Sequence, residues 1–160
     1  MPTAKIESRA TLRGHPVHPV LIHFPIAALV MLLGTDIAYV WTEDYFWARA
    51  GLWLAAIGTG FGALSGVAGA IDLFTVGPIR RLVTAWAHGI LAVMLLSLAA
   101  FNLMLRWGDD PSALIMPWGL YISGLTALLI NATGVLGGHL VYEYGVGVDI
   151  DEATGRDVKP

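Results

Sequence analysis

The chain has 160 residues, of which 56% are hydrophobic and only 13% are charged, and its formal net charge is -3. With a mean hydropathy of +0.69, this composition excludes an ordinary soluble domain and predicts an integral membrane protein. The absence of cysteine excludes disulfides, thiolate metal sites, iron–sulfur clusters and covalently attached haem. Basic residues are spread over the termini and loops, so no nucleic-acid-binding surface is expected.

The first apolar segment begins directly after a stretch rich in histidine and proline. Residues 14–25 read GHPVHPVLIHFP, and the chain stays largely apolar after them. A helix over residues 20–41 has about the 20 residues that are needed to cross the hydrocarbon core of a membrane. Pro19 suits the first turn of this helix, whereas Pro25 lacks a backbone donor and predicts irregular backbone around His23.

Three further apolar segments predict an all-α integral membrane protein with four helices packed as a bundle. The later helices are expected at about residues 48–73, 82–106 and 113–140. Glycines recur at helical spacing in the second of the four helices, and this face is expected to pack closely against a neighbour. These glycines are Gly58, Gly62, Gly66 and Gly69. Residues 1–149 thus form one transmembrane domain, followed by a polar, acidic tail at residues 150–160.

The distribution of Lys and Arg predicts how the bundle is oriented. Four spans return the chain to its starting side, so the N-terminal region, the loop between helices two and three, and the tail share that side. Seven basic residues lie there: Lys5, Arg9, Arg13, Arg80, Arg81, Arg156 and Lys159. Only Arg49 and Arg106 lie in the loops on the other side. This bias predicts that both termini are cytoplasmic.

Six ionisable residues are expected to converge on the cytoplasmic end of the bundle, because helices one and three begin there and helices two and four end there. They are His15, His18, His23, Asp72, His88 and His139. Ionisable side chains inside a membrane are costly and mark functional sites by default. We therefore predict that Asp72 and His88 face the bundle interior together with His23.

Other polar residues in the spans are expected to have structural roles. Asp36 lies toward the opposite end of the first helix and is expected to pair with Asn102 or water. Asn131 lies near the middle of the fourth helix and is expected to form an interhelical hydrogen bond. Tryptophans at the extracytoplasmic end are expected to anchor the bundle at the membrane surface.

Four motifs, HPVHPVLIHFPIA, SGVAGAIDL, AHG and GGHLVYEYGVGVD, resemble the small bacterial membrane proteins grouped as domain of unknown function 2231. The resemblance covers about residues 14–149 and implies a multi-pass protein of the bacterial inner membrane. It implies no general activity. It also hints at redox work, because some relatives look as if they are joined to, or lie near, Rieske-type iron–sulfur domains; this chain carries no such domain.

Three interpretations of the histidine cluster remain open. The first is a b-type haem held between helices, with His88 as one axial ligand and His23 or His18 as the other. The second is a non-haem zinc or iron site with ligands drawn from the six residues above, in which His15 and His18 have a spacing that suits one metal. The third has no cofactor: the imidazoles pair with Asp72, Glu143 or lipid phosphates in a structural subunit of a membrane complex.

The favoured functional expectation is a redox or metal-binding membrane protein with haem b as its cofactor. The extracytoplasmic half contains no histidine, so one chain cannot hold two haems for electron transfer across the bilayer. The expected partners are the lipid bilayer, a second copy or a larger membrane complex, and a quinone or electron-transfer partner on the cytoplasmic side. These patterns do not decide whether the chain is an enzyme.

Overall fold

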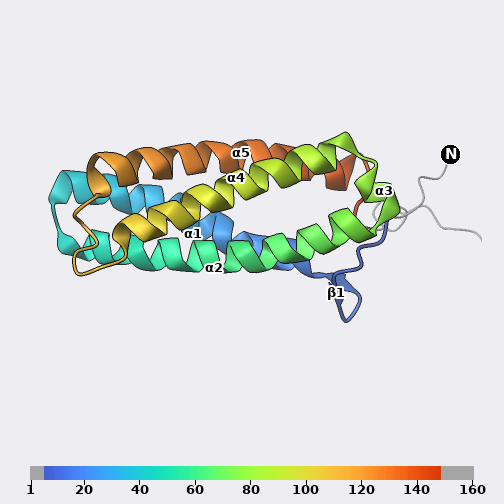
Figure 1. The fold of residues 1–160 in the computed structure, drawn as a ribbon, viewed down its shortest axis with the longest axis horizontal. Coiled ribbons are helices and arrows are strands. Elements are labelled where there is room, and N and C mark those ends of the chain that lie inside the picture. The colour runs from blue at the N-terminus through green and yellow to red at the C-terminus, as the bar shows by residue number, and fades with distance from the viewer. Residues whose placement is uncertain (1–5, 149–160) are drawn as a thin grey trace, which may run out of the picture.

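The computed structural model describes residues 6–148, which fold into four long helices lying side by side (Figure 1). The helices are α1 (Val17–Thr42), α2 (Tyr45–Thr75), α4 (Val83–Arg106) and α5 (Leu120–Tyr142). Each spanning segment is long and apolar enough to cross a membrane, with η1 (Ile115–Gly119) extending the last one at its start. The predicted all-α, four-helix membrane bundle is confirmed, whereas the predicted tail at residues 150–160 lies outside the described residues.

Short elements complete the two ends of the bundle. β1 (Thr11–Leu12) and β2 (His15–Pro16) form an antiparallel hairpin before α1, and α3 (Gly77–Arg80) joins α2 to α4. After α5, the backbone N–H of Gly147 donates to the carbonyl oxygen of Ile6 at 3.0 Å. Both ends of the described chain therefore lie at the end of the bundle that carries α3 and the hairpin (Figure 1), which we call the histidine end.

Helix α1 continues without interruption through Pro25, and it begins at Val17, ahead of the expected start at residue 20. The predicted irregular backbone around His23 is therefore wrong. Proline removes one backbone donor, but ending the helix at this depth would free several backbone groups where no water is present to bind them. Losing one hydrogen bond at Pro25 therefore costs less than ending the helix there.

Small residues at alternating spacings of three and four form the face of α2 that meets the other helices. These residues are Ala48, Gly51, Ala55, Gly58, Gly62, Ser65, Gly69 and Asp72. Helix α1 packs most extensively on this face, and a Cβ added at Gly58 would lie 2.6 Å from the Leu29 side chain. The predicted close packing holds for three of the four glycines. It is wrong for Gly66, which is exposed and lies outside the series.

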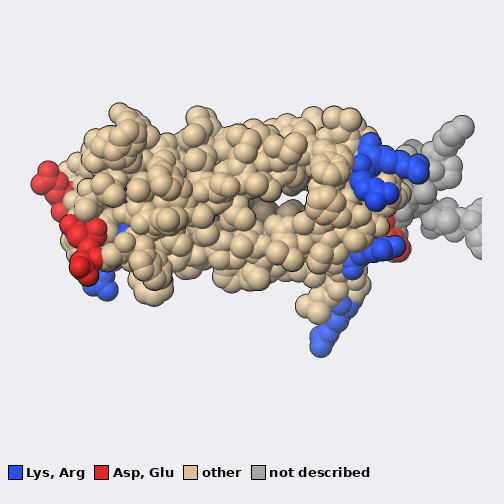
Figure 2. All heavy atoms as spheres, viewed as in Figure 1, with Lys and Arg blue, Asp and Glu red and all other residues tan. Residues whose placement is uncertain are grey.

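The charged side chains visible in Figure 2 lie at the two ends of the bundle and leave an uncharged band between them. Most of the Lys and Arg lie at the histidine end, and most of the Asp and Glu at the other. Large apolar side chains such as Val93 and Leu128 are exposed on the band, which suits contact with lipid. Asn131 is also exposed there and donates to the carbonyl oxygen of Ala127 in its own helix, so the predicted interhelical hydrogen bond is not formed.

Candidate functional site

Two of the five histidines meet inside the bundle at the histidine end. His18 lies in the first turn of α1, and His88 lies in the second turn of α4. Both side chains are half-buried, and their ring centroids are 6.2 Å apart with the ring planes nearly perpendicular, at 81°. Two helices that are distant in sequence thus bring a pair of imidazoles together.

Both imidazoles are fixed by a backbone carbonyl at Nδ1. His18 Nδ1 lies 2.9 Å from the carbonyl oxygen of Ser65 in α2, and His88 Nδ1 lies 3.0 Å from that of Thr133 in α5. A carbonyl oxygen can only accept, so we assign the proton of each neutral ring to Nδ1 and the lone pair to Nε2. No hydrogen bond among the described residues involves either Nε2. This is the arrangement found in metal-binding histidines, whose second nitrogen donates to a carbonyl or carboxylate.

Glycines let the two rings lie against the neighbouring helices. A Cβ added at Gly69 would lie 3.1 Å from His18 Nδ1, and one added at Gly137 would lie 3.3 Å from His88 Cε1. The hydroxyl of Ser65, a residue with no exposed surface, also lies 3.0 Å from His18 Nδ1. The orientation of each ring is therefore held by a helix other than its own.

Asp72 is buried, as predicted, but its carboxylate does not join the histidines. It accepts hydrogen bonds from the hydroxyl of Ser8 at 2.6 Å and from the backbone N–H groups of Arg9 and Ala10 at 2.8 and 3.0 Å. Its role in this structure is to hold the N-terminal segment against the end of α2. A carboxylate that accepts three hydrogen bonds is already well satisfied without a metal.

The other three histidines are exposed and form no contact with the pair. His15 is exposed in the hairpin, and His139 is exposed near Glu143, with 3.8 Å between its Nε2 and Oε1 of the carboxylate. His23 is exposed on α1, so the prediction that it faces the interior is wrong for the single chain. Five helical positions turn a side chain by about 140°, which takes His23 off the face that carries His18. No group of three or more His, Asp or Glu among the described residues can hold a metal ion.

A second polar centre lies at the opposite end of the bundle. Arg106 Nη2 and Asp36 Oδ2 form an ion pair at 2.8 Å, and the two side chains are only 1% and 0% exposed. Ser123 donates to the same Asp36 oxygen at 2.6 Å, while Arg106 Nε donates to Asn102 Oδ1 at 2.8 Å. Asn102 Nδ2 in turn donates to the hydroxyl of Ser123 at 2.8 Å. This closed network joins α1, α4 and α5.

The guanidinium of Arg106 also fits between two glycines. A Cβ added at Gly51 of α2 would lie 2.9 Å from Nη1, and one added at Gly119 would lie 3.0 Å from Nη2. Arg106 thus contacts all four spanning segments, although the sequence interpretation placed it in a loop. The predicted pairing of Asp36 with Asn102 was also incomplete, because Asp36 binds Arg106 and Ser123 directly and reaches Asn102 only through them. The sequence signal for this network was the pair Asn102 and Arg106, which lie one helical turn apart in α4 and therefore on the same face.

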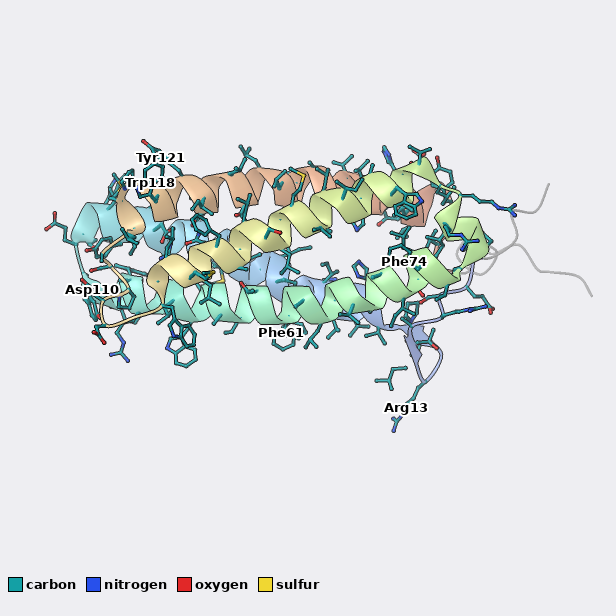
Figure 3. The ribbon with its side chains drawn as sticks, in the orientation of Figure 1. Arg13, Phe61, Phe74, Asp110, Trp118 and Tyr121 are labelled. Atoms are coloured by element: carbon teal, nitrogen blue, oxygen red, sulfur yellow. The ribbon has the colours of Figure 1, made fainter. Side chains whose placement is uncertain are left out.

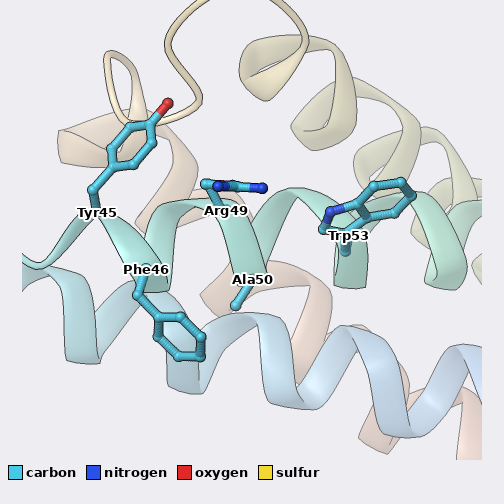
Figure 4. Close-up of a pocket in the computed structure, with 5 residues that line it drawn as sticks. All are labelled: Tyr45, Phe46, Arg49, Ala50 and Trp53. Atoms are coloured by element: carbon cyan, nitrogen blue, oxygen red, sulfur yellow. The ribbon is translucent and has the colours of Figure 1, made fainter.

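A groove of about 530 Å³ lies on the outer side of α2 at this same end (Figure 4). It is lined by Tyr45, Phe46, Arg49, Ala50 and Trp53. Trp118 and Tyr121 point outward from the start of the last span at the same end of the bundle (Figure 3). Aromatic side chains at this level are typical of the membrane–water interface. The groove therefore belongs to an interfacial belt, and its lining offers no histidine or carboxylate to a metal.

Residues 14–150 match the model of a family described as predicted membrane protein (DUF2231). The chain belongs to this family. The match includes β2, all four spanning segments and both histidines of the pair, and it confirms the resemblance drawn from the motifs. No curated protein and no solved structure matches the chain. Membership of DUF2231 establishes a membrane protein, and any more specific function must be argued from the site itself.

Proposed function

We propose that this DUF2231 protein binds haem b between α1 and α4, with His18 and His88 as the two axial ligands. The observation that carries the proposal is that Nδ1 of each ring lies within 3.0 Å of a backbone carbonyl oxygen, the contact that leaves a neutral ring with its lone pair at Nε2. Haem iron accepts neutral imidazole as an axial ligand, and a bundle core can supply such ligands from facing helices.

The spacing of the pair supports a centre with two protein ligands. The ring centroids are 6.2 Å apart, so the two imidazoles could both bind one metal held between them. A hollow between α2 and α4 in this half of the bundle is visible in Figure 2. A non-haem zinc or iron ion needs three or more protein ligands, and the described residues offer no such group. Haem supplies the remaining ligands itself, so it is favoured over a bare ion.

Haem, when bound, supplies a one-electron redox couple. The protein's own contribution is to orient the two rings and to exclude water. The carbonyls of Ser65 and Thr133 fix the tautomers, and the exposed apolar band keeps the surroundings in lipid. We infer that electrons are exchanged with a quinone or a partner subunit at the histidine end only, since the other end has no histidine.

Cellular placement and assembly are part of the same proposal. The excess of Lys and Arg at the histidine end supports a cytoplasmic location for both termini in a bacterial inner membrane. Burial of Arg106 strengthens this bias, because Arg49 is then the only accessible Lys or Arg at the other end among residues 6–148. The broad apolar surface supports self-association or incorporation into a larger membrane complex.

The optical spectrum of the purified protein tests the haem assignment. We expect a Soret band that shifts on reduction in the wild type and is lost or strongly weakened in His18→Ala and His88→Ala. His23→Ala and His139→Ala are matched controls, because these imidazoles are exposed away from the pair, and they should keep the band. A colourless, stably folded protein with stoichiometric zinc or iron would favour the non-haem alternative, and one without any metal would leave a structural subunit.

A further inference from the structure

The hairpin formed by β1 and β2 projects sideways from the bundle, with Arg13 at its tip (Figures 1 and 3). It ends where α1 begins, at Val17, so it lies at the level where the first span enters the membrane. The hairpin runs across the helix axes and not along them (Figure 1), which is the direction of the surface of a membrane crossed by the four helices. This position is independent of any cofactor in the bundle.

The tip of the hairpin has an unusual residue in its turn. Arg13 and Gly14 have φ values of 51° and 84°, which is the two-residue turn that normally takes Asn or Asp followed by Gly. Arginine rarely adopts a left-handed backbone conformation, so the sequence accepts strain here to place a cation at the tip. Arg13 makes no hydrogen bond or ion pair with the described residues, and Figure 2 shows a cationic group set apart at this tip.

An apolar side chain stands directly beside this cation. Leu12 is 71% exposed although it is part of a paired strand, and it contacts no core. Residues 9–16 contain two arginines and a histidine but no acidic residue. An aliphatic side chain next to a guanidinium suits the membrane–water interface. There the aliphatic side chain can contact acyl chains while the guanidinium contacts lipid phosphates.

The base of the hairpin is held by hydrogen bonds to the ends of two spanning helices. Asp72 accepts from the backbone N–H groups of Arg9 and Ala10, and the N–H of Val17 donates to the carbonyl oxygen of Ala10 at 2.8 Å. These bonds fix the hairpin to the ends of α1 and α2. A flexible loop would not hold Leu12 and Arg13 at one depth.

We propose that the hairpin is a lipid-binding element in which Arg13 binds the phosphate of an anionic phospholipid and Leu12 inserts between its acyl chains. Guanidinium binds phosphate through charge-assisted, often paired hydrogen bonds, and anionic lipids attract exposed cations at the membrane surface. This interaction goes beyond the haem proposal and does not depend on it.

The absence of cysteine allows single labels to be placed without background changes. Leu12→Cys carrying a nitroxide is reconstituted in vesicles of phosphatidylcholine, with and without an equal amount of phosphatidylglycerol. Its accessibility to oxygen and to a water-soluble nickel reagent is compared with labels at Asp109, in an exposed loop, and Val93, in the apolar band. We expect several-fold lower nickel accessibility at Leu12 than at Asp109, and a further decrease when phosphatidylglycerol is present.

A charge variant separates phosphate binding from simple proximity to the bilayer. Arg13→Gln in the Leu12→Cys protein should abolish the effect of phosphatidylglycerol, whereas Arg81→Gln, an exposed arginine at the same end, should leave it intact. Nickel accessibility at Leu12 equal to that at Asp109 in both lipids would overturn the proposal and place the hairpin in water. A phosphatidylglycerol effect that survives Arg13→Gln would equally remove Arg13 as the phosphate ligand.

Discussion

Removing one member of the buried ion pair is expected to destabilise the bundle far more than removing both. Arg106→Met deletes the hydrogen bonds to Asp36 and Asn102 and leaves a carboxylate with no exposed surface and no cation beside it. Two charge-assisted hydrogen bonds are worth about 1.5–3 kcal/mol each, and breaking a buried pair typically costs roughly 3–5 kcal/mol. We therefore expect the free energy of unfolding to fall by about 4 kcal/mol.

The double variant gives the sharper result. Asp36→Leu combined with Arg106→Met replaces both charges by apolar side chains, and replacement of a whole buried pair is often neutral or stabilising. Its loss should therefore be smaller than that of Arg106→Met alone. The free energy of unfolding is measured by following helicity in mixed micelles with increasing dodecyl sulfate. Arg49→Met, which removes an exposed arginine at the same end, is the matched control.

Two outcomes would refute this reasoning. If Arg106→Met loses no more stability than Arg49→Met, the ion pair contributes nothing beyond an exposed charge. If the double variant loses as much as the sum of Arg106→Met and Asp36→Leu, the two side chains act independently and the 2.8 Å contact between Arg106 and Asp36 carries no coupling.

Three further expectations concern packing, orientation and pH. Gly51→Ala should lower the thermal midpoint because its Cβ would lie 2.9 Å from a buried guanidinium nitrogen, whereas Gly66→Ala, on an open surface, should leave it unchanged or raise it. A reporter active only in the periplasm should be silent at the C-terminus and active in the loop between α1 and α2; the reverse pattern would invert the orientation. Hydrogen bonds from the hydroxyl and the backbone N–H of Ser112 lower the pKa of the exposed Asp110. These bonds therefore stabilise the folded loop above the unfolded-state pKa of Asp110, and that stabilisation is lost as pH falls through the folded-state pKa. Ser112→Ala should raise the Asp110 pKa in a carboxyl-carbon NMR titration, and an unchanged titration would contradict that cause.

Hydropathy was sufficient to predict the four spans and the end of the bundle to which the histidines belong. Depth along a membrane follows from counting residues, because every helix must cross the same thickness. Rotation of each helix about its axis does not follow from that count. For this reason His23 was predicted to face the interior with His88, although it is His18 that meets His88 in the structure.

Residues at the ends of spans were the hardest to interpret. Arg106 is the last residue of α4, and an arginine at that position normally reaches out to the interface. Its burial depends on a carboxylate from α1 and on two glycines from other segments, which only the tertiary arrangement brings together. Asp72 shows the converse, because two of its three partners are backbone N–H groups of the N-terminal segment, which carry no side-chain signal, and the third is the hydroxyl of Ser8.

The most direct test of the two-histidine centre is the ligation state of iron in the purified, haem-loaded protein. Low-temperature electron paramagnetic resonance of the oxidised protein distinguishes low-spin iron with two imidazole ligands from high-spin iron with one. We expect a low-spin signal in the wild type that converts to high-spin in His18→Ala and in His88→Ala, and that stays low-spin in His23→Ala. A high-spin wild type, or a low-spin signal that survives loss of either member of the pair, would contradict axial ligation by His18 and His88.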